Sequence, residues 1–158
     1  MASKIIYDFA DEQDVLDVDF ERMERAVAKI LADADVTRGR MEIAVVKAEP
    51  MREMNVQFLG HDYPTDVLAF ALEDDLERGV LEGNIVVCSD VAVESAAEIG
   101  WKPEEELLLY VIHGALHLVG YDDHSPEDAP IMHKKEREYL SFVGVDGSRS
   151  RPEDVEQS

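Results

Sequence analysis

Apolar residues recur every three or four positions in one stretch near the start of the chain, at Phe20, Met23, Val27, Ile30, Leu31 and Ala34. This spacing predicts a helix with a single apolar stripe. Residues 4–9 before it and 41–48 after it are short segments rich in isoleucine, valine and other apolar residues, a pattern typical of strands. The first third of the chain is therefore expected to fold as strand, helix, strand.

The middle of the chain continues with alternating elements. Residues 50–59 predict a short helix with Pro50 in its first turn and Gly60 after its end. The polar segment 61–66, interrupted by Pro64, predicts a loop, and the apolar runs 67–72 and 84–88 predict two further strands. A helix to Ile99 follows, for which Ser89 or Asp90 is the expected cap.

The last third is predicted to be helical. One helix opens with Pro103 and three glutamates, which suit the positive end of the helix dipole, and ends at Gly120. Another begins after Ser125 and reaches about Phe142. We expect an α/β (α+β) fold in which a mixed sheet of about four strands is covered by helices. Residues 1–143 would form this single domain, and residues 144–158 a flexible acidic tail.

Charge limits the partners that the chain can bind. It has 36 acidic and 15 basic residues, a formal net charge of −21, which repels nucleic acid and anionic membranes at low salt. The single cysteine, Cys88, cannot form a disulfide within one chain, and the first residues contain no apolar run long enough for a signal peptide or a membrane span. We therefore expect a cytoplasmic location and no membrane partner.

Histidines gather in one region of the sequence. Four of the five lie between positions 113 and 133, and His113 and His117 are four residues apart on a predicted helix, so their rings share a face. Two such histidines can be surface or core residues, but a glycine turn at Gly120 can bring Asp123 or His124 back as a third ligand. The spacing predicts one Zn²⁺ per chain, although iron, nickel or copper also suit such ligands.

The histidine pair is similar to that of zinc proteases with the motif His-Glu-x-x-His, so its helix is zincin-like. In those proteases the glutamate after the first histidine is the general base. Position 114 is a glycine in this chain. Glycine cannot accept a proton, which disfavours protease chemistry of that kind.

The segment His113-Gly-Ala-Leu-His-Leu-Val-Gly-Tyr-Asp122 resembles the signature of the YbeY family, and Met132 and Glu136 follow at the family's distance. Asn55, the segment 64–68 with Phe70, and the strand 83–87 resemble its upstream elements. The resemblance implies a single-domain, zinc-dependent endoribonuclease that cleaves single-stranded RNA in ribosomal RNA maturation and ribosome quality control. It implies ribosomal RNA and the ribosome or ribosomal proteins as partners, and DNA is not expected.

Three positions differ from the family pattern. The third zinc histidine of the family aligns with Asp123, while His124 is one residue beyond, and either side chain can ligate zinc. Leu59 stands where many members have an arginine thought to contact RNA phosphate, and leucine cannot make that contact. Ala69 replaces a serine, and Asn84 replaces an acidic residue.

The resemblance places Thr65, Asp66 and Asp122 near the cleft as candidate catalytic residues. Asp66 would position water or orient a ligand histidine, and its alternative role is to cap a turn. His61 and His133 are expected at the surface and Cys88 in the core. Six basic residues could form a patch for RNA: Arg22, Arg25, Arg38, Arg40, Lys47 and Arg52.

Two other functions fit the same sequence. Leu59 favours a ribosome-associated factor that keeps the metal for stability and has little catalysis. A metallohydrolase of small molecules or peptides is the second, and Gly114 disfavours it.

Overall fold

The structure, a computed structural model, describes residues 3–122 and 124–145. In chain order its elements are β1 (Lys4–Glu12), α1 (Phe20–Asp33), β2 (Arg38–Val46), α2 (Ala48–Leu59), β3 (Val67–Asp75), a 3-10 turn η1 (Leu76–Arg78), β4 (Val80–Cys88), α3 (Ser89–Ile99), α4 (Pro103–Leu118) and α5 (Asp128–Phe142). The helices and strands expected from the sequence are therefore confirmed.

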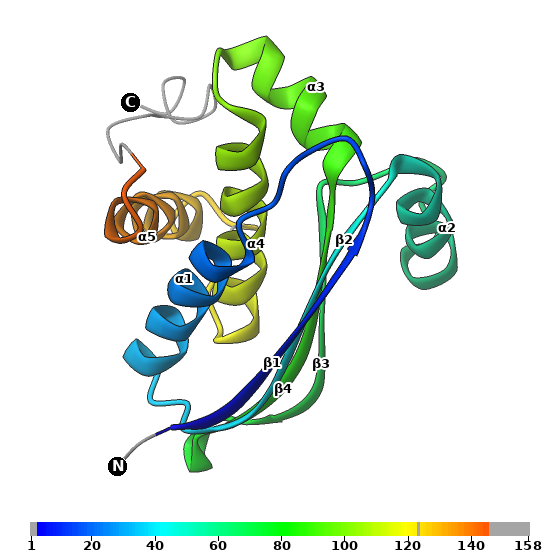
Figure 1. The fold of residues 1–158 in the computed structure, drawn as a ribbon. Coiled ribbons are helices and arrows are strands. Elements are labelled where there is room, and N and C mark those ends of the chain that lie inside the picture. Colours follow the sequence, from blue (N-terminus) through cyan, green and yellow to red (C-terminus); the bar gives the residue numbers. More distant parts are fainter. Residues whose placement is uncertain (1–2, 123, 146–158) are drawn as a thin grey trace.

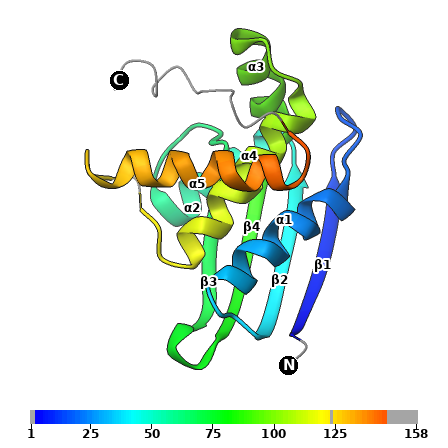
Figure 2. The same ribbon diagram turned by 90° about the vertical axis from the view of Figure 1, so that its left-hand side faces the viewer.

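The four strands form one mixed sheet in the order β1-β2-β4-β3. Strands β1, β2 and β4 run parallel, and β3 runs antiparallel to β4 at one edge. Figure 2 shows this order behind α1 and α4, with β3 and β1 at the two edges. Antiparallel β3 places the loop before it, residues 60–66, beside the carboxyl end of β4.

All four strands begin or end outside their predicted limits. β1 continues to Glu12, β2 begins at Arg38, β3 continues to Asp75, and β4 begins at Val80. These extra residues pair in register, as in Lys4 with Arg38 and Arg38 with Val80. Backbone hydrogen bonds continue the ladder through charged positions, whereas the sequence prediction followed only the apolar residues.

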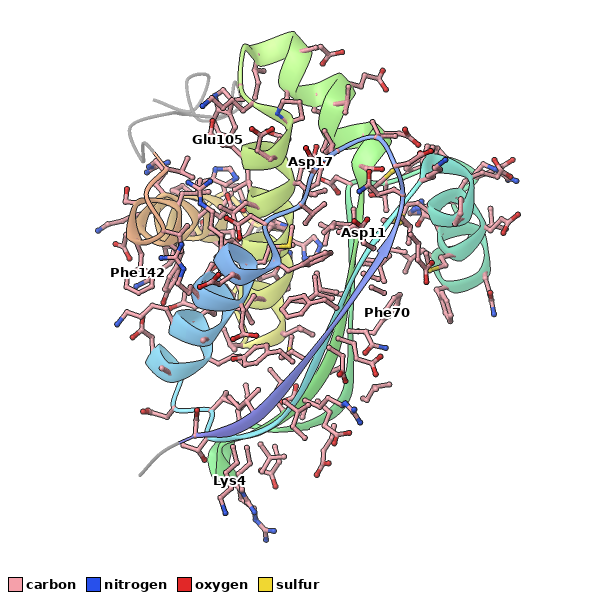
Figure 3. The ribbon with its side chains drawn as sticks, in the orientation of Figure 1. Lys4, Asp11, Asp17, Phe70, Glu105 and Phe142 are labelled. Atoms are coloured by element: carbon pink, nitrogen blue, oxygen red, sulfur yellow. The ribbon has the colours of Figure 1, made fainter. Side chains whose placement is uncertain are left out.

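Helices cover the two faces of the sheet unequally. Figure 1 shows α1, α4 and α5 on one side of the sheet and α2 on the other. The main core lies on the first side, and a smaller cluster of Val46, Met51, Leu68 and Cys88 lies between the sheet and α2. Phe70 packs against this smaller cluster and points to the same side in Figure 3. Cys88 is fully buried, as expected.

Helix α4 is the centre of the main core. Residues 105–112 are all buried, and so are Ala115 and Leu116. The helix contacts both β3 and β4 and is flanked by α1, α3 and α5. Each buried leucine stabilises the fold by roughly 1.5–3 kcal/mol, so α4 is held firmly against the sheet. The polar side chains on α4 are positioned with it.

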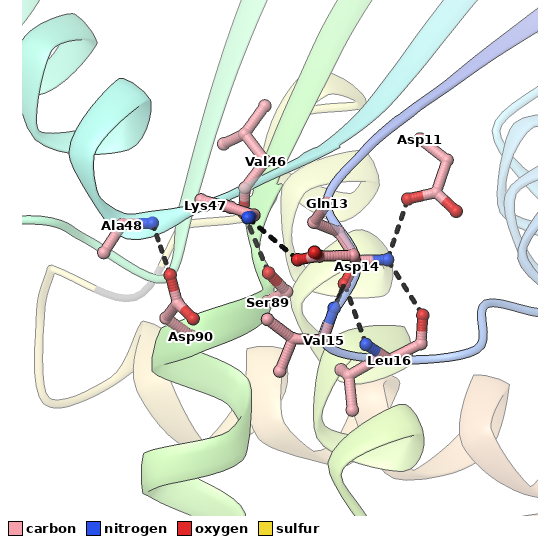
Figure 4. Close-up of polar contacts among 10 residues, drawn as sticks. All are labelled: Asp11, Gln13, Asp14, Val15, Leu16, Val46, Lys47, Ala48, Ser89 and Asp90. Atoms are coloured by element: carbon pink, nitrogen blue, oxygen red, sulfur yellow. Dashed lines mark hydrogen bonds and ion pairs between the residues drawn. The ribbon is translucent and has the colours of Figure 1, made fainter.

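The sequence prediction that Ser89 or Asp90 caps α3 is wrong. The Asp90 carboxylate accepts a hydrogen bond from the Ala48 amide (2.7 Å) at the start of α2, and the Ser89 hydroxyl donates to the Val46 carbonyl (3.2 Å). Neither side chain caps α3. Figure 4 shows both bonds joining β2, α2 and α3 at one junction, beside an ion pair between Lys47 and Asp14 (2.8 Å). The Ser89 hydroxyl and the Asp90 carboxylate therefore make tertiary hydrogen bonds in place of the cap that the local sequence predicts.

The last helix also differs in one respect. His133 is buried, not at the surface, because it lies on the same side of α5 as Met132 and Glu136, which pack against α4. The domain continues slightly past its predicted end, since Val145 is buried and its amide donates to the Leu140 carbonyl (2.9 Å). Most of the predicted tail, residues 146–158, lies outside the described residues.

Candidate metal centre

One stripe of α4 carries four polar side chains. Glu106, Tyr110, His113 and His117 are separated by four, three and four residues, a spacing that places them on one face of a helix. His113 and His117 come from the last two turns, before the helix ends at Leu118. The stripe therefore runs from a buried glutamate to a pair of histidines.

The two histidines point at the same place. Their Nε2 atoms are 3.0 Å apart, and the rings meet edge to face with centroids 4.5 Å apart. Two histidine nitrogens bound to one tetrahedral zinc, each at about 2.0–2.1 Å, are about 3.3 Å apart. The separation in this structure is close to that value, so the pair fits a shared cation.

Glu136 of α5 contacts the ring nitrogen of His113 that does not face His117. Its Oε2 lies 2.6 Å from His113 Nδ1, and the glutamate is only 2% exposed. A neutral His113 that donates its Nδ1–H to this carboxylate keeps its Nε2 lone pair for a metal. A carboxylate behind a ligand histidine is a common arrangement in metal sites and raises the basicity of the ligand.

The chain turns back immediately after the histidine pair. Gly120 adopts a φ of +107°, which favours glycine, and the Tyr121 amide donates to the Leu116 carbonyl (3.0 Å). This bond folds the following residues back along the last turn of α4. Tyr121 therefore lies beside the last turn of α4, which carries His117.

Of the two candidates for the third ligand, only His124 lies within the described residues. Asp123 lies outside the described residues. The His124 ring centroid is 6.4 Å from that of His117, and its side chain is 83% exposed. His124 contacts Asp122 through its ring, and its amide donates to the Asp122 carboxylate (3.0 Å). In residues 3–122 and 124–145 no group of three histidine, cysteine or acidic side chains is close enough to hold a metal ion.

The loop with Thr65 and Asp66 is fixed from both sides. The Asn55 side chain donates to the Tyr63 carbonyl (2.9 Å), and the Cys88 amide donates to the Asp66 carbonyl (3.0 Å). The Asp66 carboxylate accepts from the Val67 amide (2.8 Å) and from the Thr65 hydroxyl (3.3 Å). Asp66 therefore caps the turn into β3, the alternative considered from the sequence.

This loop forms one wall of a cavity of about 430 Å³. Tyr63, Thr65 and Asp66 line it on one side, and Glu106 and Tyr110 line it from the α4 stripe. Burial raises the pKa of Tyr110, which lines the cavity together with Ser95 and Glu106. Thr65 and Asp66 thus face the part of α4 that directly precedes His113. Tyr110 and Glu106 escaped the sequence prediction, although the four-three-four spacing could have identified them.

A second cavity, of about 500 Å³, lies between α1 and α5. Lys29, Asp33, Tyr121 and Tyr139 line it, and it contains none of the predicted site residues. It is larger than the first cavity, and neither His113 nor His117 lines it.

Gly114 faces the sheet and not the histidine pair. A Cβ at this position would lie 3.0 Å from Ile85 Cγ2 and 3.2 Å from Val67 Cγ2. A glutamate here would therefore enter the contact between α4 and the β3–β4 pair. The absence of a base at position 114 follows from packing.

The six basic residues come from α1, β2 and α2 and from the junction between the last two. Arg22 and Arg25 are on α1, whereas Arg40 points to the opposite side of the sheet from its buried neighbour Met41. Three of the six are in ion pairs: Arg40 with Asp8, Lys47 with Asp14, and Arg52 with both Glu49 and Asp62. Leu59 is 53% exposed at the end of α2 and supplies no charge.

Helix length gives one further result. Among the helices of the described residues, none is long and apolar enough to cross a bilayer.

A family model and several proteins similar to this chain share one description. The family model for Endoribonuclease YbeY matches residues 8–144. An Endoribonuclease YbeY of Rhodopirellula baltica is 40% identical over 84% of this chain and 70% of its own length. One of Bacillus licheniformis is 33% identical over 91% of this chain and 98% of its own. A Thermotoga maritima protein with a known solution structure has a TM-score of 0.63 and 28% identity, covering 93% of this chain and 98% of its own.

Proposed function

The chain belongs to the YbeY family of endoribonucleases, and from this premise we propose that it is a zinc-dependent enzyme that cleaves single-stranded RNA. The observation that carries the metal dependence is the convergence of the His113 and His117 Nε2 atoms to 3.0 Å. The buried carboxylate of Glu136 behind His113 supports it.

His113, His117 and either Asp123 or His124 would hold the zinc. Bound there, zinc supplies a Lewis acid for a phosphodiester oxygen. Glu136 keeps the His113 Nε2 lone pair directed away from α5. Thr65 and Asp66 would border the bound RNA at the loop before β3, and Asp122 would hold the loop that carries the third ligand through its bonds to His124.

We place the enzyme in the cytoplasm, in ribosomal RNA maturation and ribosome quality control. A net charge of −21 and the dispersed basic residues predict weak binding of free RNA. Ribosomal proteins would then supply part of the contact to the substrate. DNA is not an expected substrate.

The test uses purified protein and an unstructured RNA oligonucleotide. We expect cleavage by the wild type and none by the His113→Ala, His117→Ala double variant at equal concentration and equal folded fraction. Cleavage that persists in the double variant would assign the activity to a contaminant.

Elemental analysis of the same preparations identifies the metal and its third ligand. We compare the wild type with Asp123→Ala and His124→Ala, and the variant that loses its zinc names the ligand. If both retain the metal, the proposed ligand set is wrong.

One alternative has an observation in its favour. Leu59 offers no positive charge where many family members have arginine, which favours a metal-stabilised ribosome-associated factor with weak catalysis. Zinc retained in a folded protein that cleaves no RNA would support this alternative. A hydrolase of peptides or small molecules is disfavoured, because Gly114 cannot act as a base.

A further inference from the structure

We propose that the cavity between the 63–66 loop, α3 and α4 binds a nucleobase next to the cleaved phosphodiester and selects guanine. This inference rests on the proposed function for its biological context, but the binding that it predicts can be measured without catalysis.

The first argument is position along α4. Tyr110 and Glu106 line the cavity and precede His113 by three and seven residues on the same helical face. With a rise of 1.5 Å per residue, they lie about 4.5 Å and about 10.5 Å from His113 along the helix axis. These spans are comparable to the distance between a base and its own phosphate. A nucleotide with its phosphate at the histidine pair can therefore place its base in the cavity.

The second argument is the chemistry of the lining. Three carboxylates face the cavity, from Asp66, Glu98 and Glu106, while none of the described residues that line it is lysine, arginine or histidine. Such a lining repels phosphate and attracts groups that donate hydrogen bonds. The cavity thus suits a base and not the RNA backbone.

The third argument separates guanine from the other bases. Guanine presents two adjacent donors, N1–H and the N2 amino group, which match the two oxygens of one carboxylate. Uracil presents one N–H between two carbonyl groups, which a carboxylate repels. Adenine and cytosine present an amino group beside a ring acceptor, so each offers only one donor to the same carboxylate.

Glu106 is the carboxylate best placed to make this distinction. It is only 6% exposed, and it lines the cavity one helical turn before Tyr110. A carboxylate has about four acceptor sites, enough to accept both guanine donors at once. A hydrogen bond to a buried charge is stronger and more selective than one at the surface.

An aromatic pair stands at the loop side of the cavity. The Tyr63 and His61 rings are stacked, with centroids 5.5 Å apart and planes 11° apart. Tyr63 lines the cavity and is about half exposed, so one edge of the pair remains accessible to a ligand. Bases bind to such platforms by stacking without regard to sequence, which leaves the choice of base to the carboxylates.

The experiment measures nucleoside binding by two-dimensional NMR of the ¹⁵N-labelled protein. Guanosine is expected to shift amides of residues 63–66, 95–99 and 106–110 and to bind roughly tenfold or more tightly than uridine. Inosine, which lacks the N2 amino group, is expected to bind between the two.

Three variants test the assignment. Glu106→Gln replaces one of the two carboxylate oxygens with an NH2 group, which donates hydrogen bonds. It should remove the preference for guanosine. Glu104→Gln makes the same charge change at an exposed position two residues away and should keep the preference. If Glu106→Gln fails to fold, Ser95→Leu, which fills the cavity from α3, should weaken guanosine binding and leave the carboxylates in place.

The outcomes separate this inference from the proposed function. Guanosine bound at these residues by a protein that cleaves no RNA would overturn the nuclease and keep the base site. Equal binding of uridine and guanosine, or shifts confined to other residues, would overturn the base site even if RNA is cleaved. Shifts of the same amides by Mg²⁺ alone, with none from guanosine, would make the cavity a cation site and also overturn it.

Discussion

Gly114→Ala is the sharpest test of how α4 is held against the sheet. The added Cβ would lie 3.0 Å from Ile85 Cγ2, 3.2 Å from Val67 Cγ2 and 3.6 Å from Ala69 Cβ. Favourable contacts between carbon atoms lie at about 3.5–4.0 Å, so two of the three are too short. Ile85 and Val67 are β-branched residues on β4 and β3, and their side chains cannot rotate away easily.

Two opposing terms determine the size of the effect. Alanine in place of glycine inside a helix stabilises by about 1 kcal/mol. Overpacking of a rigid core costs about 1–3 kcal/mol. We therefore expect the free energy of unfolding to fall by about 1 kcal/mol. We also expect RNA cleavage to fall further than this loss explains, since α4 carries both histidines.

Gly83→Ala is the matched control for this reasoning. Gly83 is on β4 and faces α4 from the sheet. A Cβ there would lie 2.8 Å from Leu118 Cδ1, a shorter contact than any at Gly114. That atom is the end of a flexible side chain, so the strain can be relieved by a rotamer change. Gly83→Ala should cost less stability than Gly114→Ala.

Urea unfolding followed by circular dichroism measures both variants, with an unchanged denaturant slope as the sign of an unchanged folded state. A Gly114→Ala protein as stable as the wild type, or a reversed order of the two variants, would refute the reasoning.

Three further predictions concern the metal, acid and RNA. Glu136→Gln should lower zinc affinity roughly 10–100-fold in a chelator competition, with Glu138→Gln on the same helix unchanged; equal loss in both would contradict a specific role. The Tyr139 hydroxyl donates a hydrogen bond to Asp33 and lowers the pKa of that carboxyl below 3.8. Their bond therefore stabilises the fold fully above pH 3.8. This contribution is lost as the pH falls through the lower pKa of the folded state. Tyr139→Phe should therefore cost stability at pH 7, by less than about 1 kcal/mol because Asp33 is 44% exposed, and the cost should shrink in acid unfolding curves below pH 3.8. Leu59→Arg should tighten RNA binding and steepen its dependence on salt by about one released ion; an unchanged slope would place residue 59 away from the RNA.

The sequence predicted those parts of the fold that depend on local patterns. Helix α1 was predictable because its apolar residues repeat every three or four positions. The limits of β2 and β4 were not, because Arg38 and Glu82 are held in the ladder by neighbouring strands and not by their own side chains. Asp90 binds the start of another helix, Ala48, a contact between residues 42 positions apart.

The candidate site divides in the same way. The proximity of His113 and His117 was predictable because it follows from helix geometry. The cavity was not predictable, since its walls come from a loop and two helices that meet only in the folded chain. His133 shows the same limit: its burial depends on how α5 crosses α4, and no local pattern encodes that crossing.

The bonds at the junction of β2, α2 and α3 also bear on the kinetics and thermodynamics of ligand capture. The Cys88 amide ties the 63–66 loop to the end of β4. Asp90 ties α3 to α2 (Figure 4). The loop wall and the α3 wall of the cavity are therefore fixed before any ligand arrives. A ligand that enters a preorganised site does not have to order a loop. Its association rate should then be limited by diffusion and desolvation, and a conformational step need not appear in stopped-flow traces.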